Sequence, residues 1–191
     1  MTGAQQHGEV RWQRWIRALN EDGPYSHVPF RCAYHEAGHT VAYIHGLREL
    51  NMKFKRPLIR YVELELHESG RWDGAVQPNY YADTDWKIVA LLAGPFAEVM
   101  YCGSHRVMHS ARLYSGGAAD FEKVDKLIDR LSAETNRKRV LKPFIPRTIA
   151  FLEAHWHEVE ALARALAEEK KIEGNLIAEI IDVAGPRTPT Q

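Results

Sequence analysis

Two histidines and a glutamate in one short segment have the spacing of a metal-dependent hydrolase. The residues His35-Glu36-Ala37-Gly38-His39 fit the pattern H-E-x-x-H. On a helix, residues i and i+4 lie one turn apart on the same face, so both imidazoles can reach a single Zn²⁺ ion at about 2.0–2.1 Å. Glu36 then lies beside the ion, where it can act as general base toward a zinc-bound water whose pKa the metal lowers to about 7.

The residues around this motif predict that it lies on a buried helix. Ala33, Val41 and Ile44 fall on one side of a helix running from Phe30 to Ile44, and Gly46 is a plausible stop signal. Two imidazoles and a carboxylate are costly to bury in such apolar surroundings without a partner. A bound metal ion removes that cost, so the helical context strengthens the zinc interpretation.

A catalytic zinc site needs a third protein ligand, and the residues alone leave several candidates. His45 has the spacing of H-E-x-x-H-x-x-G-x-x-H, but Ala42 occupies the position of the glycine that lets the chain turn back to the metal. Glu98 interrupts an apolar stretch, and we interpret it as a supporting or ion-paired carboxylate rather than a ligand. Asp120 follows a glycine turn and opens a helix. The lone histidines, which are more often structural or exposed than ligands, are His67, His105 and His109.

The remaining pattern is mostly helical with a small sheet, which predicts an α+β fold. The alternating segment Ile59–Leu66 is typical of a half-buried strand, and Gly74–Tyr81 is its expected partner. Asp83 and its neighbours offer caps for a long apolar helix, Trp86–Tyr101. The other predicted helices are Val10–Leu19, 118–133, Arg147–Glu169 and Gly174–Val183.

Composition excludes several functional classes. The 25 basic and 25 acidic side chains cancel, so no bulk field attracts nucleic acid or an anionic membrane. The longest apolar stretch, Ile88–Cys102, is too short to span a bilayer, and the polar N-terminus has no signal-peptide pattern. Two cysteines, Cys32 and Cys102, cannot make a disulfide framework and favour a reducing compartment. We therefore expect a cytoplasmic protein without a membrane span.

Three segments, in the same order and at the same spacing, resemble the peptidase domain of the FtsH family, the ATP-dependent zinc peptidases of membranes. The first is the H-E-x-x-H segment followed by Thr40-Val41-Ala42. Residues 91–98 resemble the family's A-G-x-x-A-E helix, and residues 115–120 resemble its S/T-G-A-x-x-D segment. The resemblance covers roughly residues 30–183 and implies a mostly helical, zincin-like fold.

The same resemblance implies roles for individual residues. It makes His35, His39 and Asp120 the Zn²⁺ ligands and Glu36 the general base. Glu98 matches a family carboxylate that supports the site, and it is the alternative ligand. The family domain forms six-membered rings, so a homo-oligomer is among the implied partners.

The departures from the family concern its other parts. The chain has no transmembrane pattern and no G-x-x-x-x-G-K-[ST] phosphate loop, and Pro95 stands where the family usually has glycine or arginine. We expect a stand-alone peptidase domain at 30–184, after an N-terminal extension at 1–29 and before a tail at 185–191. Within it, 30–142 is the expected catalytic core and 143–184 the C-terminal helical part.

The predicted function is zinc-dependent hydrolysis of peptide bonds in unfolded or flexible protein segments. The strand Ile59–Leu66 is a candidate to receive an extended peptide along an unpaired edge. Two alternatives remain open at this stage. One is a non-catalytic zinc-binding interaction module with a peptidase fold, against which Glu36 argues because structure alone does not need it. The other is a peptidase subunit that needs a separate partner to unfold its substrates.

Overall fold

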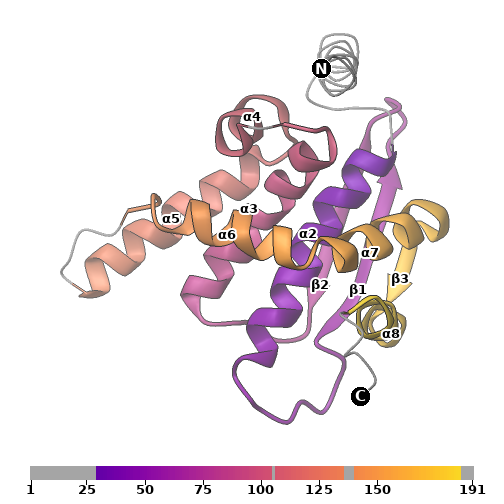
Figure 1. Ribbon diagram of the computed structural model, residues 1–191, viewed down its shortest axis with the longest axis horizontal. Helices are drawn as coiled ribbons and strands as arrows, with labels where there is room; N and C mark the ends of the chain where they lie inside the picture. The colour runs from indigo at the N-terminus through magenta and orange to yellow at the C-terminus, as the bar shows by residue number, and fades with distance from the viewer. Residues whose placement is uncertain (1–28, 105, 136–139, 186–191) are drawn as a thin grey trace, which may run out of the picture.

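Helix α2 (Pro29–Arg48) carries the H-E-x-x-H segment and lies in the middle of the fold (Figure 1). The computed structural model describes residues 29–104, 106–135 and 140–185. Every residue from Ala33 to Ile44 is buried, so the helix is covered on all sides rather than along one stripe. The helix also continues past the predicted end at Gly46. An added methyl group there would lie 2.8 Å from the Trp86 ring, so this glycine permits close packing rather than ending the helix.

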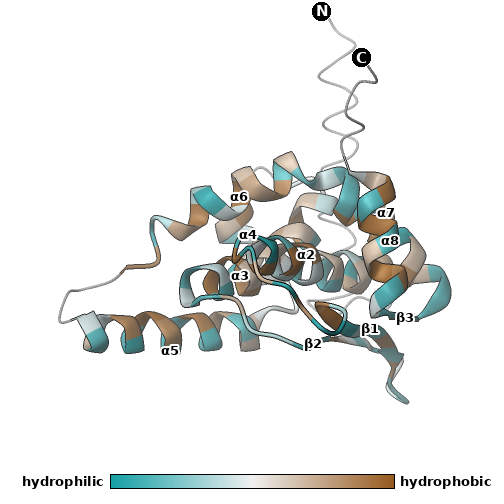
Figure 2. Ribbon diagram, turned by 90° about the horizontal axis from the view of Figure 1, so that it is seen from below, coloured by the Kyte–Doolittle hydropathy of each residue, from teal (hydrophilic) through white to brown (hydrophobic). Residues whose placement is uncertain are grey.

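The helices form layers around α2 and its neighbour α3 (Thr84–Tyr101). Helices α6 (Phe144–Ala154) and α7 (Trp156–Glu169) cover one side of this pair, while the sheet and α5 (Ala118–Thr135) cover the other (Figures 1 and 2). Helices α2 and α3 approach closely because Gly38 faces the backbone of Ala93, where even a methyl group would lie 2.5 Å from the carbonyl oxygen. The predicted cap is confirmed, since Asp83 accepts a hydrogen bond from the Trp86 amide at 2.9 Å.

The sheet has three antiparallel strands in the order β2-β1-β3. Strand β1 (Ile59–Leu66) has the predicted bounds, and its alternation is interrupted by a register irregularity between Ile59 and Tyr61. Strand β2 (Trp72–Pro78) begins earlier than predicted. Strand β3 (Lys171–Glu173) was not predicted, because three residues are too few to display a period. It pairs with the middle of β1, so among the described strands β1 is central and β2 is an edge.

One helical prediction is wrong, and one helix was not predicted. The segment Arg147–Glu169 is not one helix, because the helix is interrupted at His155 and α7 begins after it. Neither proline nor glycine marks that break. Helix α6 begins earlier than predicted, at Phe144, and its first turn tolerates Pro146. The segment 104–118 contains a helix that the sequence did not reveal, α4 (Val107–Tyr114).

The last helix, α8 (Gly174–Ala184), extends one residue beyond its predicted end. Three predictions fall wholly or mostly outside the described residues. They are the helix Val10–Leu19, the extension at 1–29 and the tail at 185–191. In the part of the chain that the structure describes, no helix is both long and apolar enough to cross a membrane. The architecture is thus α+β and mostly helical, as predicted.

Candidate metal centre

Two imidazoles from α2 and one carboxylate from α5 converge in a buried position. Nε2 of His35 lies 3.2 Å from Oδ2 of Asp120, and Nε2 of His39 lies 3.3 Å from the same oxygen. The two rings stand edge to face with their centroids 4.7 Å apart. The three side chains are about nine-tenths buried. They form a group whose ligand atoms lie close enough together to hold one metal ion.

The hydrogen bonds of the other ring nitrogens fix how these imidazoles face the carboxylate. Nδ1 of His39 lies 2.7 Å from the carbonyl oxygen of Ala90, and Nδ1 of His35 lies 3.0 Å from Oε2 of Glu98. Both partners are acceptors, so each Nδ1 carries a hydrogen and donates it. A neutral ring then presents its Nε2 lone pair to Asp120, which is the form that binds a metal.

The donor set fits the zinc ion that the motif implies. Two imidazole nitrogens and a carboxylate oxygen are zinc ligands, and in a tetrahedral site with bonds of about 2.0–2.1 Å such atoms lie about 3.3 Å apart. The separations from Asp120 to His35 and His39 have this size. Two lone pairs facing a carboxylate also repel one another, so the arrangement requires a cation, either protons on Nε2 or a metal ion.

Asp120 reaches this position because the turn before α5 packs against α3. The amide of Asp120 donates to the carbonyl of Gly117, which starts the helix. An added methyl group on Gly117 would lie 2.6 Å from Cβ of Pro95, so the turn sits directly on α3. Oδ1 of Asp120 accepts from Lys123 at 3.2 Å, which leaves Oδ2 facing the histidines.

Glu98 positions the His35 ring through Nδ1. It is not one of the side chains that converge on the metal-binding atoms. Its Oε1 accepts a hydrogen bond from Arg31 at 2.6 Å. Its Oε2 accepts from Nδ1 of His35 at 3.0 Å and from the Gly116 amide at 3.1 Å. With both oxygens engaged, Glu98 links α2, α3 and the turn before α5, which is the geometry of a supporting carboxylate.

The electrostatics of the centre favour a positive charge between the histidines and Asp120. Burial would lower the pKa of His35, but its hydrogen bonds to Asp120 and Glu98 outweigh burial and raise that pKa to about 10. Burial would raise the pKa of Asp120, but the neighbouring His39 and His35 lower it well below its usual range. Glu36 differs, because burial raises its pKa more than the two histidines lower it.

Glu36 lies where two cavities meet. Each cavity has a volume of about 300 Å³, and both are lined by His35, Glu36 and Asp73 together with Gly116 and Ala119. Strand β2 forms one wall, and Gly74 passes so close to Glu36 that an added methyl group would lie 2.4 Å from Cγ of the glutamate. Glu36 therefore borders both cavities, next to the metal-binding group.

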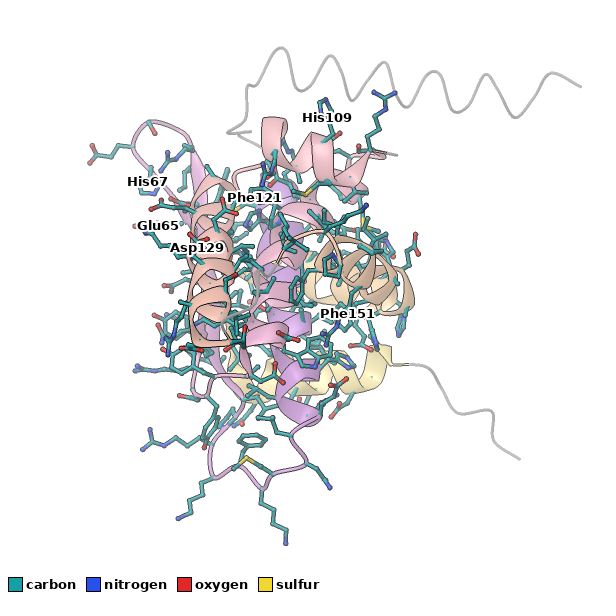
Figure 3. All side chains as sticks on the ribbon, turned by 90° about the vertical axis from the view of Figure 1, so that its left-hand side faces the viewer. Glu65, His67, His109, Phe121, Asp129 and Phe151 are labelled. Atoms are coloured by element: carbon teal, nitrogen blue, oxygen red, sulfur yellow. The ribbon has the colours of Figure 1, made fainter. Side chains whose placement is uncertain are left out.

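The other candidate histidines lie elsewhere. His45 is not near His35 and His39 but contacts Glu158 of α7 at 2.7 Å, so the longer H-E-x-x-H-x-x-G-x-x-H interpretation is wrong. His67 and His109 are exposed, and Figure 3 shows them at the edge of the molecule, on the β1–β2 hairpin and on α4. His105 lies outside the described residues.

Sequence reasoning missed two residues beside the centre. Arg31, the partner of Glu98, precedes His35 by one helical turn, and this i, i+4 spacing is the signal that would have found it. Cys32 packs against the core and also lines the first cavity. Burial raises the pKa of its thiol above the usual value, which favours the protonated form over the thiolate.

The comparisons with known proteins add no family. No protein-family model matches the chain, and the curated proteins include no significant relative.

Gly94 offers a test of how tightly the centre is built. A methyl group at this position of α3 would lie 2.3 Å from Nε2 of His39. We expect Gly94→Ala to displace the His39 ring and to weaken zinc binding about 10- to 100-fold, as losses around metal ligands typically do. Competition with a chromophoric chelator measures this affinity. Gly116→Ala is the matched control, because a methyl group there meets nothing within 4 Å. Equal zinc affinities of the two variants would contradict the placement of the His39 ring against Gly94.

Proposed function

We propose that this chain is a zinc-dependent endopeptidase that cleaves extended or unfolded polypeptide segments. The observation that carries the proposal is the convergence of His35 and His39 on Oδ2 of Asp120, beside a buried Glu36 that opens onto two cavities. The resemblance of three segments to the FtsH-family peptidase domain supports the same assignment, including a zincin-like fold.

Each residue has a distinct role in the proposed reaction. His35, His39 and Asp120 would hold the ion. When bound, Zn²⁺ would act as a Lewis acid that polarises the scissile carbonyl and makes water acidic enough to lose a proton near neutral pH. Glu36 accepts that proton and passes it to the leaving amine. Its raised pKa suits a group that must both take up and release a proton, because the carboxyl then holds the transferred proton more readily.

The structure changes which strand is the candidate to bind the peptide. We predicted that role for β1, but β1 pairs with β2 on one side and with β3 on the other. Strand β2 has a described partner only in β1, and its residues 73–76 line the cavity that also contains His39 and Asp120. An extended chain added to β2 would therefore pass the centre, with main-chain hydrogen bonds giving affinity. Such binding selects substrates that are already unfolded.

Metal removal tests the proposal. We expect the zinc-loaded protein to cleave fluorescently labelled casein, to stop when a chelator removes the metal, and to recover when Zn²⁺ is restored, because the carbonyl loses its Lewis acid without the ion. Zinc bound without cleavage of casein or any other unfolded chain would favour a non-catalytic binding module. Cleavage that resists full removal of the metal would contradict the assignment.

A further inference from the structure

A second cluster of metal-binding side chains lies at the other end of α2. His45 comes from the last turn of α2, His155 stands at the break between α6 and α7, and Glu158 comes from the first turn of α7. Nε2 of His45 lies 2.7 Å from Oε2 of Glu158, and Nδ1 of His155 lies 2.8 Å from Oε1. Their ligand atoms all lie within 4.8 Å of one another.

One buried carboxylate lies among histidines in this cluster. The Glu158 side chain is only 3% exposed, yet among the described residues its ion-pair partners are histidines: His45, His155 and, at 3.7 Å, His157. No lysine or arginine of the described chain lies within ion-pair distance of it. A buried carboxylate needs hydrogen-bond donors or a positive charge beside it, and a metal ion held between these imidazoles and the carboxylate would supply that charge.

The surroundings are suited to an ion that arrives from solvent. The side chains of His45 and His155 are 22% and 26% exposed, so the cluster opens to the surface while its carboxylate lies beneath. The two rings lie together, with centroids 3.9 Å apart, and Phe151 packs against both. Figure 3 shows Phe151 on the inner side of the α6–α7 layer, toward α2. Both imidazoles are thus held by packing as well as by Glu158.

We propose that His45, His155 and Glu158 form a second binding site for a divalent transition-metal ion such as Zn²⁺. Two imidazole nitrogens and a carboxylate are a donor set that binds such ions, with water completing the coordination. The ion joins the C-terminal end of α2 to the point where α6 ends and α7 begins. It stabilises the layer that covers α2, and it takes no part in the reaction proposed above.

Isosteric substitutions separate metal binding from the hydrogen bonds. The side-chain amide of glutamine places a nitrogen near the position of Nε2, and that of asparagine near the position of Nδ1. The double variant H45Q/H155N therefore retains two donors to Glu158 but has no imidazole in the cluster. His109→Gln is the matched control, since this histidine is exposed on α4.

Zinc titration of the metal-free protein against a chromophoric chelator gives the stoichiometry. We expect two zinc ions per chain for the wild type and for H109Q, but one for H45Q/H155N. We expect the Asp120→Asn variant to lose the ion at the proposed catalytic centre and to retain the ion at His45, His155 and Glu158. This result distinguishes the two sites. If H45Q/H155N binds as many ions as the wild type, with the same affinities, the cluster only forms hydrogen bonds between α2 and α7 and the proposal is overturned.

A measurement on the unsubstituted chain covers the case in which the double variant fails to fold. Nuclear magnetic resonance of ¹⁵N-labelled imidazoles follows each ring nitrogen as ZnCl₂ is added. We expect the resonances of Nε2 of His45 and Nδ1 of His155 to shift together as one equivalent binds. Unchanged resonances for both rings at saturating zinc would also overturn the proposal.

Discussion

Glu36→Gln is expected to lower casein cleavage about 10²- to 10⁴-fold while leaving the bound zinc in place, because this is the usual contribution of a general base. The amide keeps the shape of the side chain but cannot accept a proton from water. The zinc content should persist because His35, His39 and Asp120 are unchanged, and Glu36 is not among the three side chains that converge. Cleavage rate and zinc content, measured on the same preparation, test both halves of this expectation.

Glu65→Gln provides the control for this loss. Glu65 lies on β1 and is exposed, and Figure 3 shows it at the periphery of the molecule. This change removes one carboxylate from the chain but leaves the cavities intact. We therefore expect the Glu65→Gln variant to cleave casein at the wild-type rate. If Glu36→Gln cleaves casein as fast as Glu65→Gln does, Glu36 is not the base and the reaction proposed here is wrong.

Asp120→Asn is expected to weaken zinc binding at the centre by more than about 100-fold, and to remove cleavage with it. Losses of 10- to 100-fold are typical when a residue that merely supports a ligand is changed, and Asp120 is placed as a ligand itself. Asparagine preserves the volume but removes the negative charge that faces His35 and His39. Chelator competition measures the affinity, and circular dichroism checks that the helices persist.

Glu98→Gln is the informative comparison for this variant. An amide oxygen at position 98 can still accept from Arg31 or from the Gly116 amide, but it holds His35 less firmly than a carboxylate does. We expect its zinc affinity to fall by only about 10- to 100-fold. A larger loss for Glu98→Gln than for Asp120→Asn would transfer the third ligand position from Asp120 to Glu98.

The sequence was most informative where one short segment contains its own signal. The H-E-x-x-H helix, the Asp83 cap and strand β1 each follow from local patterns, and the structure has all of them. The third member of the centre was different. The spacing of the residues left His45, Glu98 and Asp120 open, and only the resemblance selected Asp120, because contacts between residues 85 positions apart have no local pattern.

The failures have physical reasons of the same kind. Strand β3 is visible only through its pairing with β1, so the sequence could not show that β1 is central and β2 an edge. The break at His155 has no proline or glycine. It coincides with the hydrogen bond from Nδ1 of His155 to Glu158 in the first turn of α7, a local contact that has no distinctive sequence signature. A separate long-range contact, between Nε2 of His45 and Glu158, lies away from the H-E-x-x-H centre, and no local pattern shows it.

Anomalous diffraction at the zinc absorption edge, from crystals grown with saturating Zn²⁺, would locate the ion among the three side chains. We expect an anomalous peak within coordination distance of Nε2 of His35, Nε2 of His39 and Oδ2 of Asp120, with Glu36 beside it. Density that shows these three side chains without an anomalous peak between them would contradict this expectation.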